Sequence, residues 1–207
     1  FVKTVLPIII NENQNILMIR SFVNELKGKL ETFRTLNNNE IRKLNDIAKK
    51  YNIKYQNKHK LDLVDEILSN VDVIPNSIVL AQAAIESGWG KSRFAKEYNA
   101  LFGEYTYDDS EGVIPLEREN GDTHLIKAFS SYSNSVESYF DNINSHYAYE
   151  DFRDIRNIMR KRNNFSNVNL LVNKLSTYAE DENYIKTIRQ VIKTNNFGIF
   201  DQKTISY

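Results

Sequence analysis

Residues 75–90 read PNSIVLAQAAIESGWG, a segment that is apolar along almost its whole length. Pro75 suits the first position of a helix, since proline has no N–H to pair, and Gly88 suits the position just past the end. These signals predict a helix from about Pro75 to Ser87. Because its residues leave almost no polar face, we expect the helix to be buried on nearly all sides.

Glu86 is the carboxylate that ends this helix. Apolar surroundings and the negative end of the helix dipole both disfavour its charge, so both raise its pKa. A carboxylic acid that keeps its proton near neutral pH is suited to general acid catalysis. The alternative is a surface glutamate paired with Lys91 or Arg93, because ion pairs also perturb carboxylates.

The composition is that of a folded protein with balanced charge. The 207 residues are 41% hydrophobic and 12% aromatic, and 27 Lys and Arg balance 27 Asp and Glu. A net charge of zero gives no field that steers the protein onto nucleic acid, so we expect no nucleic-acid partner. The chain has no cysteine, and its three histidines are far apart, so we expect no metal and no cofactor.

No apolar run approaches the roughly 20 residues of a membrane span, and no export signal is visible in this chain. Because the sequence opens at Phe1 without methionine, a removed signal or anchor stays an open alternative.

Helical periodicity continues on both sides of the apolar segment. Apolar residues recur at helical spacing in residues 16–30, 41–51 and 61–68, which predicts three amphipathic helices in an N-terminal layer. Asn134 and Glu137 have the spacing of a capping box and predict the start of a later helix. Other helices are expected at about 92–98, 150–162, 167–176 and 183–194, and the arginines of 150–162 are expected on a solvated face.

Residues 104–129 are predicted to form the β structure. Turn signals occur at 108–112 and at Asn120-Gly121, and the second favours a tight hairpin. The predicted fold class is α+β, mainly α, with a small β-hairpin lobe and an N-terminal helical layer. We expect residues 1–72 to be a helical extension packed on a core domain of residues 73–207. A lobe beside a buried helix that ends in Glu86 would form a cleft.

Three motifs in the second half of the chain resemble those of one bacterial family. They are Glu86-Ser87-Gly88-Trp89-Gly90, Asn99-Ala100-Leu101-Phe102-Gly103, and the segment from Tyr178 to Tyr184. Together they are similar to the signature of the peptidoglycan glucosaminidases, with Glu180 where that family has threonine. Leu6-Pro7, Ile74-Pro75, Ile114-Pro115 and Asn142-Ile143-Asn144 resemble the Bax-type branch, so the likeness covers nearly the whole chain.

The resemblance implies a lysozyme-like fold, with residues 73–207 as the glucosaminidase catalytic domain. It also implies hydrolysis of the β-1,4 bond after N-acetylglucosamine in cell-wall peptidoglycan, with Glu86 as general acid. Glu117 corresponds to the second catalytic carboxylate of several members, although Arg118 follows it where they have tyrosine. The alternatives for the second group are the substrate's own acetamido group and three further carboxylates, Glu111, Glu119 and Asp122.

Tyr178 occupies the position of a family tyrosine that lines the cleft near the acid, and we count it with Glu86 and Glu117 as a candidate catalytic residue. The candidate substrate contacts are Gln82, Trp89, Asn99, Phe102, Tyr107 and Tyr147. A place in the hydrophobic core is the alternative for Tyr178, Trp89 and Phe102. Gln82 lies one turn before Glu86, so its amide is expected either to orient the acid, to contact substrate or to be satisfied internally.

The expected partner is the peptidoglycan glycan strand, and the expected state is a monomer. This substrate predicts a location in the periplasm, in the cell envelope or outside the cell. Two other functions fit the same residues. A lytic transglycosylase also uses one acidic glutamate in such a cleft, and a non-catalytic peptidoglycan-binding module would keep the cleft without turnover.

Overall fold

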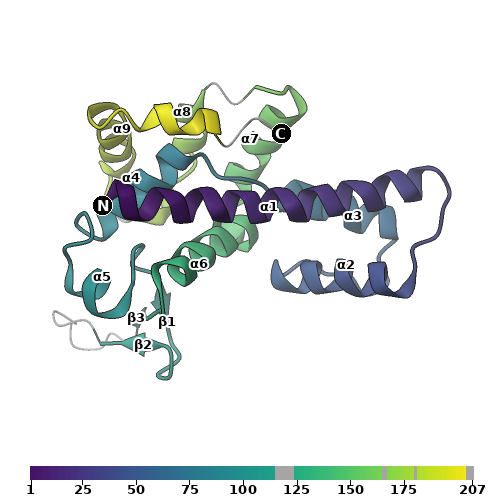
Figure 1. The fold of residues 1–207 in the computed structure, drawn as a ribbon, viewed down its shortest axis with the longest axis horizontal. Coiled ribbons are helices and arrows are strands. Elements are labelled where there is room, and N and C mark those ends of the chain that lie inside the picture. The colour runs from purple at the N-terminus through teal and green to yellow at the C-terminus, as the bar shows by residue number, and fades with distance from the viewer. Residues whose placement is uncertain (115–123, 165–166, 180, 204–207) are drawn as a thin grey trace.

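The computed structural model describes residues 1–114, 124–164, 167–179 and 181–203, and it is mainly helical (Figure 1). The α-helices are α1 (Val2–Glu31), α2 (Asn38–Lys50), α3 (Lys60–Asn70), α4 (Asn76–Glu86), α5 (Arg93–Tyr98), α6 (Tyr132–Ser145), α7 (Glu150–Lys161), α8 (Val168–Val172) and α9 (Tyr184–Thr194). Short 3₁₀ helices are η1 (Tyr147–Tyr149), η2 (Ser176–Tyr178) and η3 (Phe197–Lys203). The strands are β1 (Tyr105–Thr106), β2 (Gly112–Val113) and β3 (Leu125–Lys127). This content confirms the predicted α+β class, mainly α.

Helix α4 is the buried helix that the apolar segment predicts. Every residue from Asn76 to Ala84 is buried, and α1, α9 and η3 pack against the helix. Pro75 caps the helix instead of occupying its first turn, so the helix begins one residue later than expected. Gly88 has a φ of 56°, the left-handed conformation that commonly ends a helix, as its position predicted.

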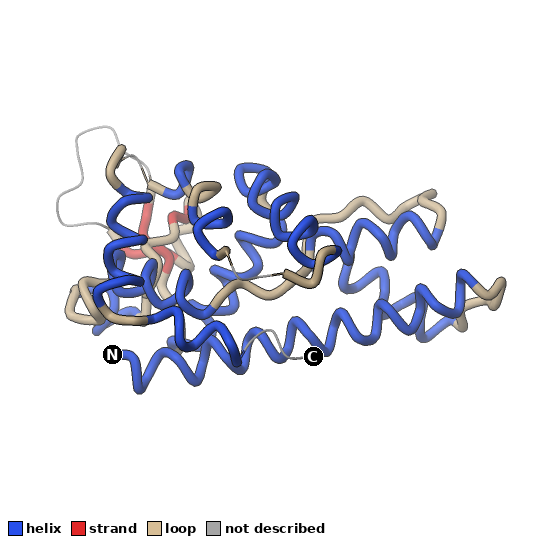
Figure 2. The backbone as a smooth tube through the Cα atoms, turned by 90° about the horizontal axis from the view of Figure 1, so that it is seen from above, coloured by secondary structure: helices blue, strands red, loops and turns tan. Residues whose placement is uncertain are grey.

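Helix α1 is a single helix of 30 residues that runs along the length of the molecule (Figures 1 and 2). It contacts α3, α4 and α6. The sequence predicted only its second half, because Pro7 and the polar run 11–15 interrupt the apolar periodicity. Part of that polar run is buried and paired. The Asn13 side chain donates to the Ile74 carbonyl at 2.9 Å and to Asn76 Oδ1 at 2.9 Å, and it accepts from the Ile74 N–H at 3.0 Å.

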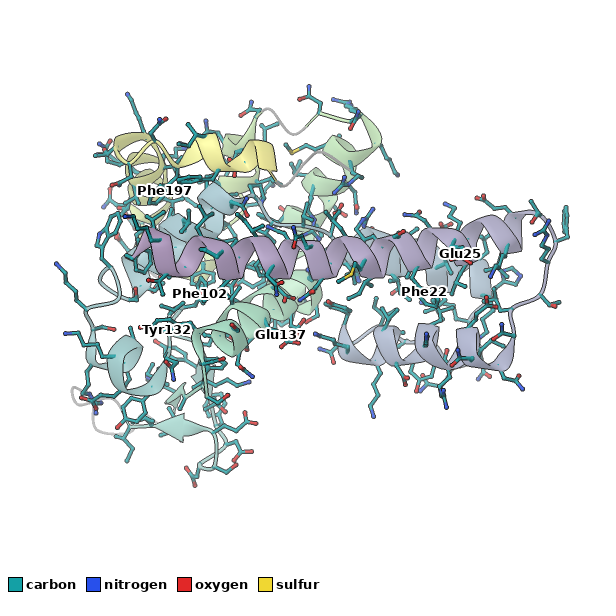
Figure 3. All side chains as sticks on the ribbon, in the orientation of Figure 1. Phe22, Glu25, Phe102, Tyr132, Glu137 and Phe197 are labelled. Carbon is teal, nitrogen blue, oxygen red and sulfur yellow. The ribbon has the colours of Figure 1, made fainter. Side chains whose placement is uncertain are left out.

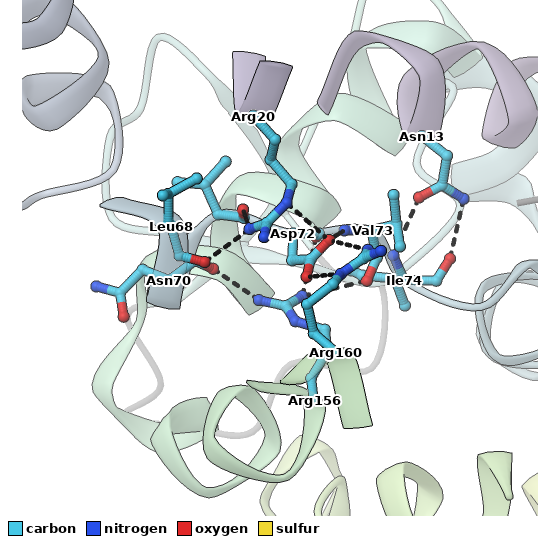
Figure 4. Close-up of polar contacts among 10 residues, drawn as sticks. Asn13, Arg20, Leu68, Asn70, Asp72, Val73, Ile74, Arg156 and Arg160 are labelled. Atoms are coloured by element: carbon cyan, nitrogen blue, oxygen red, sulfur yellow. Dashed lines mark hydrogen bonds and ion pairs between the residues drawn. The ribbon is translucent and has the colours of Figure 1, made fainter. Parts of the chain in front are cut away.

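Asp72, between α3 and α4, is joined to two helices, α1 and α7, through arginine side chains (Figure 4). Its buried carboxylate accepts hydrogen bonds from Arg160 at 2.9 and 2.5 Å and forms an ion pair with Arg20 at 3.3 Å. Burial alone would raise the pKa of Asp72, but the hydrogen bond from Arg160 and the charges of Arg20 and Arg156 outweigh burial and lower it. The cluster fastens α1 and α7 to the segment that leads into α4.

The prediction of a solvated arginine face on α7 is wrong for two residues, Arg153 and Arg156, which are both buried. Arg156 donates to the carbonyls of Asn70 at 2.6 Å and Asp72 at 2.9 Å, while Arg153 donates to those of Ile143 and His146. Backbone carbonyls at helix ends can accept from guanidinium groups, which lets these arginines be buried.

The small sheet is antiparallel and has the order β1-β3-β2. Tyr105 pairs with Ile126 on one side of β3, and Val113 pairs with Ile126 on the other. The expected turn at Asn120-Gly121 lies outside the described residues. The sheet extends from the helical part of the molecule at the end where α4 terminates (Figure 1).

Side chains fill the space between α1 and the helices around it (Figure 3). The labelled Phe102 and Phe197 lie on opposite sides of α1 in this view, and both are buried. Helix α6 begins at Tyr132, before the predicted capping box, because the Ser131 side chain accepts from the Asn134 N–H and caps the helix earlier. None of the helices in the described part of the chain combines the length and the hydropathy of a membrane span.

Candidate active site

Glu86 ends α4 at the wall of a cleft of about 930 Å³. The helix, the β lobe, α6 and the segments around η1 and η2 all contribute to this cleft. Its described lining is Glu86, Phe102, Gly103, Glu104, Tyr105, His124, Asn142, Tyr149, Thr177, Tyr178 and Ala179. The aromatic and amide groups of this lining are suited to contact a sugar, which presents both apolar ring faces and hydroxyl groups.

The environment of Glu86 favours its neutral form. Burial raises the pKa of the carboxyl above its ordinary value, and a hydrogen bond from the Tyr184 hydroxyl at 2.7 Å offsets part of that rise. A hydrogen bond donated to a carboxylate stabilises the charged form, while burial destabilises it. Here burial is the larger effect, so the acid keeps its proton to a higher pH than an exposed glutamate.

A chain of three hydrogen bonds leads from the interior to Glu86. The Tyr139 hydroxyl donates to Gln82 Oε1 at 2.5 Å, Gln82 Nε2 donates to the Tyr184 hydroxyl at 2.9 Å, and Tyr184 donates to Glu86 Oε1. Each donor in turn fixes the orientation of the next group. Gln82 is fully buried, so its amide orients the acid through Tyr184.

The loop of residues 99–103 packs against the carboxyl of Glu86. Asn99 has a φ of 53°, and its side chain donates to the Phe129 carbonyl at 2.9 Å. Phe102 is buried and stacks on Tyr139, with ring centroids 4.2 Å apart. Gly103 has a φ of 61°, and a Cβ there would lie 3.8 Å from Glu86 Oε2. A glycine at this position therefore satisfies the backbone and keeps the space beside Oε2 open.

Tyr178 lines the cleft, where the sequence places it. Its hydroxyl donates to the Phe102 carbonyl at 3.1 Å, and its ring lies parallel to that of Tyr184, with centroids 5.8 Å apart. Tyr178 thus contacts both the loop of residues 99–103 and Tyr184, the hydrogen-bond donor to Glu86, and fixes their relative positions. The sequence analysis predicted no individual role for Tyr184 or Tyr139, although Tyr184 is the last residue of the third motif.

Of the six predicted substrate contacts, only Phe102 belongs to the described lining of the cleft, whereas Gln82, Asn99, Trp89, Tyr107 and Tyr147 do not. Trp89, with a φ of 59°, is 39% exposed and packs between Phe1 and Phe197 at centroid distances of 5.6 and 6.2 Å. Tyr107 and Tyr147 are 77% and 80% exposed.

Of the four carboxylates proposed as second group, Glu117, Glu119 and Asp122 lie outside the described residues. Glu111 forms an ion pair with Lys127 at 3.5 Å and borders a different hollow, beside α6. The sequence missed Glu104, which lies in the Glu86 cleft. One signal was present, because Glu104 directly follows the glycine of the second motif.

Among the described residues, no three His, Asp or Glu side chains come together in a way that could hold a metal ion.

Comparison with known proteins gives consistent results. The family model described as Mannosyl-glycoprotein endo-beta-N-acetylglucosaminidase (Glucosaminidase) matches residues 61–197. The chain is 32% identical to Protein bax of Escherichia coli K12 over 181 residues, which cover 86% of this chain and 62% of that protein. It is 35% identical to the peptidoglycan hydrolase FlgJ of Escherichia coli O157:H7 over 92 residues, 40% of this chain and 29% of FlgJ. The chain thus spans less than two thirds of either relative.

Among solved structures, the catalytic domain of the autolysin Auto from Listeria monocytogenes matches with a TM-score of 0.48 and 19% identity. That match covers 87% of this chain and 86% of the autolysin domain.

Proposed function

Because the chain belongs to the glucosaminidase family, we propose that it hydrolyses the β-1,4 bond after N-acetylglucosamine in bacterial peptidoglycan, with Glu86 as general acid. The observation that carries the proposal is the position of Glu86. It is a partly buried carboxyl with a raised pKa at the wall of a cleft large enough for several sugar rings. The name of FlgJ, a peptidoglycan hydrolase, supports the choice of substrate.

The two oxygens of Glu86 have different surroundings, which supports this role. Oε1 accepts the hydrogen bond from Tyr184, while Oε2 lies on the side of Gly103, which carries no side chain. The proton would therefore be held on Oε2 and passed to the departing glycosidic oxygen. Protonation of that oxygen by a positioned carboxylic acid is the first requirement of glycoside hydrolysis.

The positive charge that develops on the sugar requires a second group. Glu117 stays the first candidate by its correspondence with the family, and Glu119, Asp122 and the substrate acetamido group are the alternatives. Glu111 is a weaker candidate, because its described partner is Lys127 and it borders another hollow. We expect Glu117→Gln to lower kcat by several orders of magnitude and Glu111→Gln to leave it within a factor of two. Full activity in Glu117→Gln would exclude Glu117 and leave Glu119, Asp122 and the substrate acetamido group as the candidates.

The decisive experiment compares wild-type protein with Glu86→Gln on purified sacculi. We expect wild type to release reducing ends and Glu86→Gln to release none, with thermal midpoints within a few degrees of one another. Glu97→Gln, an exposed glutamate on α5, is the matched control and should retain activity. Activity in Glu86→Gln would overturn the assignment.

The products separate hydrolysis from the two other functions. Hydrolysis adds one water to each cleaved bond, while a lytic transglycosylase leaves an anhydro-sugar end, and mass spectrometry distinguishes the two. Wild-type protein that binds sacculi yet releases no soluble fragments at any pH would identify a non-catalytic binding module. We propose that the protein meets this substrate in the periplasm, in the cell envelope or outside the cell, and that it acts as a monomer.

A further inference from the structure

A second carboxyl group, that of Glu104, lines the same cleft as Glu86. Glu104 immediately precedes β1, on the β lobe, whereas Glu86 ends α4. Burial is the main cause of the raised pKa of Tyr139, Tyr149 and Tyr178, and the charges of Glu104 and Glu86 both raise it further. The two carboxyls thus border one cluster of aromatic hydroxyl groups from different elements of the fold.

Only one of the two carboxyl oxygens of Glu104 has a hydrogen-bond partner among the described residues. Oε2 accepts a hydrogen bond from the Ser138 hydroxyl at 2.8 Å. Oε1 is buried and has no hydrogen-bond partner among the described residues. A buried polar atom without a partner costs free energy, so such atoms in folded proteins often serve a ligand or an ordered water.

The surroundings of Glu104 disfavour the charged form of its carboxyl group. Lys127 on β3 is close enough to lower the pKa of Glu104, but its ion pair is with Glu111. The negative charge of Asp141 on α6 raises the pKa of Glu104. Burial is the largest influence and raises the pKa of Glu104 to about 7 despite the hydrogen bond from Ser138. At mildly acidic pH the group is therefore a neutral carboxylic acid with one O–H to donate.

We propose that neutral Glu104 is a substrate-binding residue whose carboxyl O–H donates a hydrogen bond to an acceptor oxygen of the sugar bound beside Glu86. The proposal rests on the proposed function, since it requires a glycan in this cleft. The terminal torsion of glutamate is broad, so the carboxyl can turn toward a ligand that enters. N-acetylated sugars supply suitable acceptors in their acetamido carbonyl and hydroxyl oxygens.

Binding at equilibrium tests the proposal without turnover. Glu86→Gln removes the titration of the acid, and a β-1,4-linked tetramer of N-acetylglucosamine serves as probe. If only the neutral form of Glu104 binds, the dissociation constant rises about 30-fold between pH 5.5 and 8.5, as the neutral fraction falls. Glu104→Gln in the same background keeps an amide donor and should remove this pH dependence, while Glu104→Ala should weaken binding at pH 5.5.

Two variants that leave the carboxyl in place separate this role from a structural one. Ser138→Ala removes the hydrogen bond that favours the charged form, so the pH midpoint of binding should rise. Asp141→Asn removes a negative neighbour, so the midpoint should fall. A loss of packing alone would change affinity without moving the midpoint in these opposite directions.

The proposal is overturned if the pH dependence is the same with and without Glu104→Gln, or if Glu104→Ala binds as tightly as its parent. It is also overturned if the tetramer does not bind Glu86→Gln at pH 5.5. The proposed function is judged separately, by release of reducing ends from sacculi. If the wild-type protein cleaves sacculi but the Glu104 variants bind the tetramer as their parent does, the role of Glu104 is refuted while the proposed function is retained.

Discussion

The hydroxyl of Tyr184 lies 2.7 Å from Oε1 of Glu86 and donates a hydrogen bond to it. Tyr184 belongs to α9, which packs against α4. The acid is therefore oriented by a residue 98 positions later in the chain. The contact also opposes the effect of burial on the pKa of Glu86, so Tyr184 influences both the direction and the acidity of the carboxyl.

Tyr184→Phe should shift the pH profile of activity. The hydrogen bond from Tyr184 lowers the pKa of Glu86, so its removal raises that pKa and moves the alkaline limb of the kcat profile to higher pH. At the optimum, kcat should fall on the order of tenfold because the carboxyl is less firmly oriented. The measurement is kcat against pH on sacculi. Tyr55→Phe, in the connection between α2 and α3, is the control, and an unmoved limb would contradict the prediction.

Gln82→Leu should destabilise the protein as well as slow it. The substitution leaves the buried Tyr139 hydroxyl without its acceptor and Tyr184 without its donor. Leaving such groups unpaired costs about 1–3 kcal/mol of unfolding free energy, which urea denaturation measures. The exposed Gln190→Leu should change stability by less than about 0.5 kcal/mol. Equal stability of the two variants would show that the hydrogen-bond chain contributes little.

Gly103→Ala should reduce activity and stability together. Gly103 has a φ of 61°, which costs a residue with a Cβ about 1–2 kcal/mol, and the new methyl group would lie 3.8 Å from Glu86 Oε2. Gly28→Ala in α1 is the control and should raise stability. Open space surrounds that position, and alanine favours the helix over glycine by up to about 1 kcal/mol. Thermal melts of the two variants should move in opposite directions.

Asp72→Asn should cost about 3–5 kcal/mol of stability, because it leaves the arginines around it without their counter-ion. The pKa of Asp72 is lowered in the folded protein. Its contribution is therefore fully present above the usual value of 3.8 and is lost as the pH falls below it.

The loss of stability in acid should consequently be smaller in Asp72→Asn than in wild type, as measured by urea unfolding at several pH values. Asp65→Asn, whose partner Lys27 lies at the surface, should cost less than about 1 kcal/mol. Identical acid sensitivity of wild type and Asp72→Asn would refute this account.

Local sequence signals were sufficient to predict helix α4 and where it ends. Apolar residues, Pro75 and Gly88 identify the helix, and the position of Glu86 in it predicts the raised pKa from elementary electrostatics. Tyr178 was placed in the cleft by its motif. These features depend on residues near one another in the chain, which is why sequence reasoning reached them.

The remaining features depend on contacts between distant segments. The polar run 11–15 of α1 shows no apolar periodicity, and its place in a helix depends on the pairing of Asn13 with Ile74 and Asn76. Arg156 looks solvated until the carbonyls of Asn70 and Asp72 are seen to accept from it. Glu104 carries no local sign of burial, because Ser138 and the cleft walls come from elsewhere in the chain.

The polar contacts of α1 also bear on any attempt to shorten the protein. The matched family region begins at residue 61, yet Asn13 and Arg20 hold the segment 68–76 that leads into the acid-bearing helix. A chain that starts at residue 61 would leave the N–H of Ile74 and the side chain of Asp72 short of partners. We therefore expect the first helix to be required for folding, so that trimming the protein to its family core yields an unstable fragment.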